Sequence, residues 1–177
     1  LAELIAGMHD ADGRVTLPGF YDQVRTLSDD ERAELARSPM SDETWRAMTG
    51  ASALYGEKGY SSVERVGARP TLEINGLLSG FTGEGSKTVL PAKAMAKIST
   101  RLIPNQNDKV VEAQLRAYLT AKAPPTVRWE LKSLTSGPAV LVARDTPAMQ
   151  AAVQAAVSRD REYLADATAV GITRNTA

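Results

Sequence analysis

The segment Arg69–Pro104 constrains the fold of this 177-residue chain more than any other part of it. After Pro70, apolar and polar residues alternate, and a second alternating run begins after Pro91. A period of two is typical of β-strands, because successive side chains of a strand point to opposite faces. Four glycines between Gly76 and Gly85 predict a loop with tight turns. The segment therefore predicts a strand, a glycine-rich loop and a second strand.

Both runs separate into two chemically different faces. The faces predicted to be buried hold small or apolar residues, namely Leu72, Ile74, Ala94, Ala96, Ile98, Thr100 and Leu102. The opposite faces hold Thr71, Glu73, Asn75, Lys93, Met95, Lys97, Ser99 and Arg101. One apolar face and one polar face are typical of an antiparallel sheet that is open on one side.

Helical spacing predicts most of the remaining elements. The predicted helices are one ending near Met8, one over Asp29–Arg37 after the capping pair Ser28 and Glu31, one over Asp42–Met48, one capped by Asn107 or Asp108, and one starting at Thr146-Pro147. The predicted non-helical segments are a loop over Gly50–Gly67 and a strand over Thr126–Leu134, with Val127, Trp129 and Leu131 inward.

These elements indicate an α+β fold. We expect an antiparallel sheet of three to four strands with two main helices packed on one face. Short helices are expected in an insertion over residues 13–69.

Composition excludes several classes of protein and site. The chain has 21 basic and 21 acidic residues, so no overall field favours nucleic acid or an anionic membrane. It has no cysteine, which excludes disulfides and thiolate zinc sites and fits a cytoplasmic protein. No apolar run approaches the ~20 residues that span a bilayer. The chain begins at Leu1 directly in a helical pattern, which suggests a piece of a longer protein.

Two short motifs have a simpler structural explanation than a functional one. The segment Gly80–Thr88 is rich in glycine, but it lacks the contiguous Gly-Lys-Ser/Thr of a phosphate loop, and a strand rather than a helix follows. We therefore predict a connecting loop. His9 with Asp10 and Asp12 offers weak metal ligation, and the sequence there is more typical of a turn at a helix end.

Arg101 is the candidate with two open interpretations. A guanidinium can bind a carboxylate through two parallel hydrogen bonds, which would suit a ligand with a free carboxylate. The alternative is a cross-strand ion pair, which contributes little to stability when it is exposed. The pattern alone favours the ion pair.

Four stretches of the chain together resemble a known family. They are Pro70–Ala92, which contains PTLEING and TGEGSKTVLPA, Lys97–Pro104, which reads KISTRLIP, and the upstream helix and insertion, Leu1–Asp12 and Val15–Asp22. They resemble the lid, or dimerisation, domain of the two-zinc peptidases that include carnosinase, glutamate carboxypeptidase and acetylornithine deacetylase. The resemblance covers residues 1–157 and is strongest to the carnosinase-like dipeptidases.

The resemblance implies a function for the parent enzyme and roles for four residues. Arg101 matches the arginine that binds the substrate carboxylate, and Asn75, Lys87 and Thr88 match positions near the cleft. The implied partners are a second copy of the chain, a catalytic zinc domain and a peptide or N-acyl amino acid substrate. The zinc ligands belong to the catalytic domain, so this chain alone is predicted to bind no zinc and to be inactive. The alternative is a non-catalytic dimerisation module or a composite chain.

The C-terminal tail, residues 158–177, is predicted to have a separate origin. Residues 158–175, SRDREYLADATAVGITRN, resemble the zinc-ligand helix of membrane-bound HExxH peptidases of the heat-shock type. Glu162 matches their glutamate ligand and Asp166 the aspartate after it. The HExxH helix itself is absent, so we assign Glu162 no metal role; fusion and chance similarity both remain open.

Overall fold

The computed structural model describes residues 1–140, 146–156 and 158–159. The chain divides into two units, Leu1–Val140 and Leu141–Ala177. In the second unit, residues 147–156 are helical, which confirms the helix predicted to start at Thr146-Pro147. The predicted domain boundary at residue 157 stays a prediction. No helix in the described ranges is long and apolar enough to cross a membrane.

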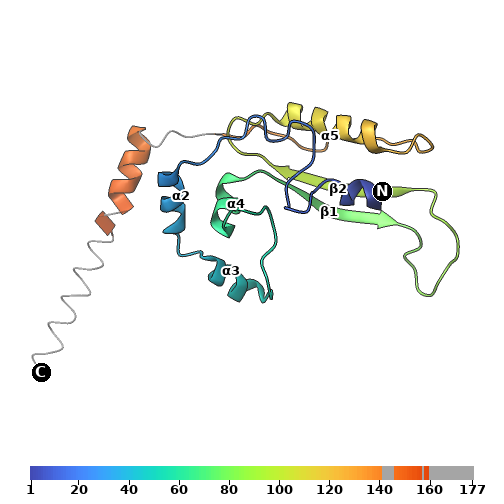
Figure 1. The fold of residues 1–177 in the computed structure, drawn as a ribbon, viewed down its shortest axis with the longest axis horizontal. Coiled ribbons are helices and arrows are strands. Elements are labelled where there is room, and N and C mark those ends of the chain that lie inside the picture. The colour runs from blue at the N-terminus through green and yellow to red at the C-terminus, as the bar shows by residue number, and fades with distance from the viewer. Residues whose placement is uncertain (141–145, 157, 160–177) are drawn as a thin grey trace, which may run out of the picture. The chain divides into compact units, whose positions relative to one another are not determined.

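The first unit holds five helices and one β-hairpin among its described residues (Figure 1). In chain order the elements are α1 (Ala2–Ala6), α2 (Asp29–Ala36), α3 (Asp42–Thr49), α4 (Ser62–Ala68), β1 (Thr71–Ser79), β2 (Ala94–Arg101) and α5 (Asp108–Lys122). Helices α2–α4 gather near the end of the hairpin where β1 begins, and the hairpin loop projects from the opposite end. The predicted α+β class is confirmed.

The sheet consists of β1 and β2 paired antiparallel, from Thr71 opposite Arg101 to Ser79 opposite Ala94. Burial along β2 alternates as expected, with Ile98 and Thr100 partly covered and their neighbours exposed. Two expectations are wrong. The sheet has two strands in the described residues rather than three to four. Residues 76–79 extend β1 instead of opening the glycine loop, because a β-bulge between Ile74 and Gly76 keeps them in the ladder.

The predicted strand over Thr126–Leu134 is also wrong. Residues 128–140 carry no assigned secondary structure. A strand is defined by its ladder of hydrogen bonds, and no described segment pairs with this one. Leu131 does pack against the core, but Val127 and Trp129 are exposed rather than inward. Alternation in the sequence was therefore insufficient without a partner strand.

The core lies between the covered face of the hairpin, α5 and the segment that follows α1. Its buried members are Met8, Val15, Leu17, Phe20, Leu72, Val111, Leu115 and Tyr118. Val111, Leu115 and Tyr118 form one face of α5, because residues three and four positions apart share a side of a helix. The Tyr118 hydroxyl donates to the Leu4 carbonyl oxygen at 2.9 Å and so fastens α1 to α5.

The helix caps agree with the sequence, but one helix was not predicted. Ser28 caps α2 as predicted, Ser41 caps α3, and Asn107 rather than Asp108 caps α5. Helix α4 replaces part of the predicted Gly50–Gly67 loop. Its signal was present, because Ser61 followed three residues later by glutamate is the same capping box that marks α2.

We predict that Leu72→Ala destabilises the chain by about 3 kcal/mol, since Leu72 is 1% exposed at the centre of the core. The matched control is Leu78→Ala on the same strand, where the leucine is 54% exposed. This control is expected to change the free energy of unfolding by less than about 0.5 kcal/mol. Urea denaturation of both variants measures the difference, and equal losses would contradict the core described above.

Candidate functional site

Arg101 is the last residue of β2 and lies on the open face of the hairpin, opposite Thr71. Its side chain is exposed. Within the described residues it forms no hydrogen bond or ion pair, so the cross-strand ion pair considered above is not formed. On this face Thr71 and Ser99 are neutral hydroxyls, and Glu73, opposite Ser99, carries a carboxylate that forms no ion pair with Arg101 in the described residues. The guanidinium is therefore available to an anionic ligand.

Asn75 lies at the β-bulge in the middle of β1, and its side chain is exposed. A bulge leaves one residue outside the ladder and bends the strand locally. The next residue, Gly76, pairs with Lys97, whose side-chain stem lies over the glycine. Lys97 is on the same open face as Arg101, four residues before it on β2, and it too has no ion-pair partner in the described part of the chain.

Lys87 and Thr88 lie in the exposed loop that joins the two strands. The Lys87 ammonium lies 4.6 Å from the centre of the Phe81 ring, a cation–π contact within the loop. The structure does not bring these residues to Arg101. The loop follows Ser79 and precedes Ala94, and the eight residues from Ala94 to Arg101 extend about 23 Å along β2. The four predicted binding residues thus form no single site within one copy of the chain.

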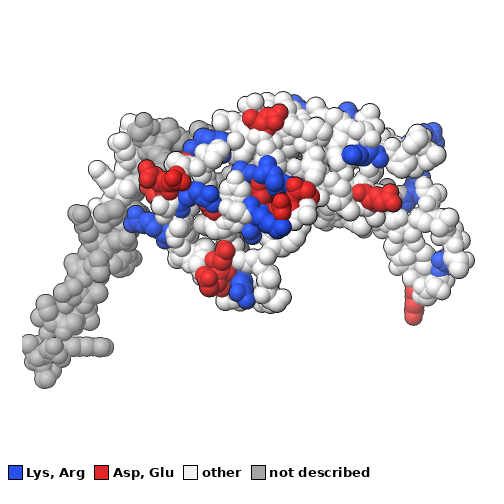
Figure 2. Space-filling model, in the orientation of Figure 1, with Lys and Arg blue, Asp and Glu red and all other residues white. Residues whose placement is uncertain are grey.

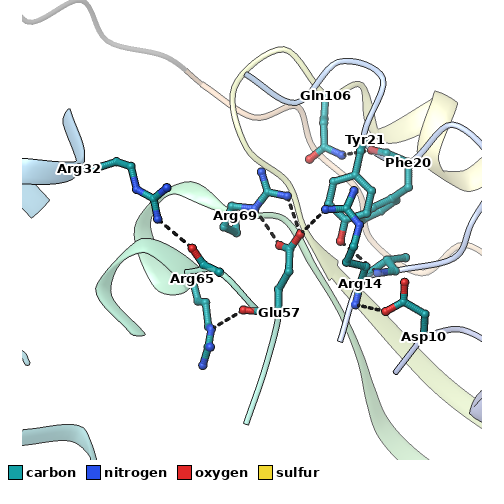
Figure 3. Close-up of polar contacts among 11 residues, drawn as sticks. Asp10, Arg14, Phe20, Tyr21, Arg32, Glu57, Arg65, Arg69 and Gln106 are labelled. Atoms are coloured by element: carbon teal, nitrogen blue, oxygen red, sulfur yellow. Dashed lines mark hydrogen bonds and ion pairs between the residues drawn. The ribbon is translucent and has the colours of Figure 1, made fainter. Parts of the chain in front are cut away.

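A buried charge cluster, which the sequence did not reveal, lies beside the start of β1 (Figure 3). It is centred on the Glu57 carboxylate, which is 7% exposed. Arg69 donates from Nε to Oε2 at 2.8 Å and from an Nη to Oε1 at 2.7 Å, and Arg14 donates to Oε1 at 2.9 Å. The Arg69 guanidinium also lies 4.2 Å from the ring centre of Tyr60 and 5.2 Å from that of Tyr21. We call this group the Glu57 cluster.

The environment of Arg69 in the Glu57 cluster raises its pKa. Burial, the largest single influence, would lower the pKa, but hydrogen bonding and charge attraction to Glu57, with smaller contributions from Tyr60 and Tyr21, together outweigh it. Burial raises the pKa of Tyr21, whose hydroxyl accepts the Val15 N–H at 3.0 Å. No local pattern links Glu57 to arginines 12 and 43 residues away, which explains why the sequence analysis missed the cluster.

The remaining polar candidates support the simpler interpretations. Asp10 accepts the backbone N–H groups of Asp12 and Arg14 at 2.9 Å, which makes the segment after His9 a turn. No three His, Asp or Glu side chains gather as a metal site in the described ranges. Acidic and basic side chains are intermixed over the centre of the visible face (Figure 2).

The comparisons with known proteins identify the family. A sequence profile of the peptidase dimerisation domain of M20 peptidases matches residues 1–127. The chain belongs to this family. The predicted resemblance to a lid or dimerisation domain is therefore confirmed. Nothing in these comparisons supports the HExxH resemblance of residues 158–175, and Glu162 and Asp166 lie outside the described residues.

The relatives in this family include dipeptidases. The chain is 26% identical over 121 residues to a Beta-Ala-His dipeptidase of Rattus norvegicus, a match that covers 68% of this chain and 25% of the relative. A Cys-Gly metallodipeptidase, DUG1, of Saccharomyces cerevisiae is 28% identical over 123 residues, covering 69% and 25%. The chain thus spans about a quarter of the length of the curated relatives it matches.

Solved structures give the same result. The metallo-carboxypeptidase Sso-CP2 of Sulfolobus solfataricus superposes with a TM-score of 0.59 at 36% identity, covering 68% of this chain and 28% of that one. Human carnosine dipeptidase 1 superposes with a TM-score of 0.58 at 26% identity, covering 67% and 25%. The fold is therefore that of the M20 dimerisation domain.

We predict that Glu57→Gln destabilises the chain by about 3 kcal/mol, because it leaves two guanidiniums without their buried counter-charge. The matched control is Asp12→Asn. It breaks the Lys58–Asp12 pair, whose N···O distance is 2.6 Å but whose side chains are 70% and 59% exposed. The control should change the free energy of unfolding by less than about 1 kcal/mol. Denaturant titration of both variants tests the prediction, and a near-neutral Glu57→Gln would contradict it.

Proposed function

We propose that this chain is the lid and dimerisation domain of a metal-dependent dipeptidase or related amide hydrolase. Its membership of the M20 dimerisation-domain family supports the proposal, as do the dipeptidase names of its relatives. The observation that carries the binding role is the exposed, unpaired Arg101 at the end of β2. The lack of cysteine fits a cytoplasmic location.

In this proposal, Arg101 binds the terminal carboxylate of a peptide or N-acyl amino acid. A planar guanidinium donates two parallel hydrogen bonds to a carboxylate and so fixes its orientation as well as its position. The flanking Thr71 and Ser99 carry no charge, and the Glu73 carboxylate opposite Ser99 forms no ion pair with the guanidinium. Fixing one end of the substrate would hold the scissile amide in place for the catalytic groups.

The catalytic metal, zinc in our proposal, would be held outside this chain. The described residues do not fit a zinc site, because no three His, Asp or Glu side chains come together among them. Metal-assisted hydrolysis would therefore depend on a separate catalytic domain of the parent enzyme. We expect the isolated chain to bind and position substrate at most, without cleaving it.

We predict that Arg101→Ala in the complete enzyme lowers kcat/KM by about 100-fold for a dipeptide with a free carboxylate, because a charge-assisted bidentate contact is lost. For the same dipeptide with an amidated C-terminus, the loss should be below about threefold, since no carboxylate is present. Lys97→Ala is the matched control, a second unpaired cation on the same strand face. Full retention of activity on the free acid by Arg101→Ala would refute the anchor role.

The length of the hairpin supports the proposed homodimer. The loop that carries Lys87 and Thr88 joins β2 about 23 Å along the strand from Arg101, whereas an extended dipeptide spans about 7 Å. One dipeptide therefore cannot contact both ends of the same hairpin. We propose that Lys87 and Thr88 contact the substrate that is bound by Arg101 of a second copy.

We predict that two variants of the complete enzyme with impaired activity restore each other when mixed. Arg101→Ala and Thr88→Ala subunits, dissociated and reassociated in equal amounts, would form mixed dimers with one intact and one doubly altered site. About a quarter of the wild-type activity should return, because half of the dimers are mixed and each has one intact site of two. Steady-state hydrolysis of the free-acid dipeptide measures the recovery.

The control for this experiment is each variant carried alone through the same dissociation and reassociation. Neither should gain activity. No recovery from the mixture, with mixed dimers demonstrated by mass spectrometry, would mean that Arg101 and Thr88 do not share a site across subunits.

A second candidate function is a module that pairs subunits without contacting substrate. The observation that favours it is a group of exposed apolar residues at the loop end of the hairpin, namely Leu77, Leu78, Phe81, Val89, Leu90 and Met95. Exposed apolar groups of this kind mark interaction surfaces. The Arg101 experiment separates the two functions, since pairing alone predicts no difference between the free acid and its amide.

A further inference from the structure

We propose that Arg69 and Gln106 are positioning residues for Arg101, and that the turn over residues 14–21 is the frame to which both are fastened. This inference rests on the proposed function of Arg101. The two residues hold the two strands of the hairpin at the same end, each through hydrogen bonds to the frame or to a group bound to it. Neither residue would touch the substrate.

The first fastening is on the β1 side. Arg69 precedes Thr71 by two residues in extended backbone, so the two side chains lie on the same side of the chain. Thr71 is the residue directly opposite Arg101 in the ladder. The Arg69 side chain is held by two hydrogen bonds to Glu57, and Glu57 is held in turn by Arg14 of the frame.

The second fastening is on the β2 side, two residues beyond Arg101. The buried Ile103 N–H donates to Gln106 Oε1 at 3.1 Å. The Gln106 Nε2 donates to the Phe20 carbonyl oxygen at 2.8 Å (Figure 3). Gln106 is buried and both ends of its amide are used, so the amide acts as a bridge between the end of β2 and the frame.

The two fastenings converge on one short segment. Phe20 accepts the Gln106 bridge, its neighbour Tyr21 lies beside Arg69, and Arg14 lies 4.3 Å from the Tyr21 ring. The strand ends that carry Thr71 and Arg101 are thus tied to the same turn, which is anchored in the core by Val15, Leu17 and Phe20, whereas the loop end of the hairpin is exposed. A bidentate contact requires the guanidinium within a fraction of an ångström, so small shifts of this end would weaken it.

A second buried carboxylate serves as a matched control. Glu64 is 5% exposed, and it accepts from Arg32 Nε at 2.6 Å. This pair joins α2 to α4 and forms no hydrogen bond with either strand in the described residues. Its loss should therefore affect stability without changing the position of Arg101.

The test uses the complete enzyme and two dipeptide substrates, the free acid and its C-terminal amide. Arg69→Lys keeps the positive charge but loses the two parallel hydrogen bonds to Glu57. Gln106→Glu keeps the oxygen that accepts from the Ile103 N–H but loses the N–H group that donates to Phe20. Each should lower kcat/KM for the free acid by about tenfold, mainly through KM, and for the amide by less than about twofold. Glu64→Gln should leave the acid-to-amide ratio unchanged even where the melting temperature falls.

The double variants complete the test. In an Arg101→Ala background, Arg69→Lys and Gln106→Glu should cause no further selective loss on the free acid, because the group that they position is gone. Equal losses on acid and amide, or losses that multiply with Arg101→Ala, would overturn the positioning role. If the wild-type enzyme itself does not distinguish acid from amide, the Arg101 anchor is wrong and the positioning role is overturned with it. An unchanged ratio in both frame variants, with a discriminating wild type, overturns the positioning role alone.

Discussion

The Glu57 carboxylate, buried between two guanidiniums, is the interaction on which the rest of this domain depends. A carboxylate removed from water is costly unless its oxygens are paired, and here Arg14 and Arg69 supply three hydrogen bonds. These residues come from three separated stretches of the chain. The network therefore makes the insertion and the hairpin mutually dependent, because neither can move away without exposing an unpaired charge inside the protein.

The hairpin is consequently an element with two unlike ends. At one end, the turn over residues 14–21, a bridging amide and an ion pair surround the start of β1 and the end of β2. At the other end, apolar and cationic side chains are exposed on a loop without regular structure. This difference suits a lid whose anchored end binds a small ligand, and whose free end contacts another surface.

Local patterns in the sequence predicted the local structure well. Capping serines, the apolar face of α5 and the alternation of β2 were all visible, because each depends on residues a few positions apart. Contacts between distant segments were not visible. The charge cluster joins residues up to 55 positions apart in the chain, from Arg14 to Arg69. The segment Thr126–Leu134 has an alternating sequence but forms no strand, because no described segment pairs with it. The family resemblance indicated Arg101 as a binding residue, but only the structure showed that Arg101 and Thr88 lie at opposite ends of the hairpin.

The bulge at Asn75 has a consequence for the direction of the whole outer hairpin. One extra residue is accommodated there without exchanging the two faces, since Ile74 and Leu77 still pair with Ile98 and Ala96, which share one face of β2. What the extra residue changes is the local twist and bend of the strand. The direction in which the loop projects therefore depends on a single amino acid about midway along β1. Deletion of that residue would change the direction of the loop and leave the sequence of the loop itself intact.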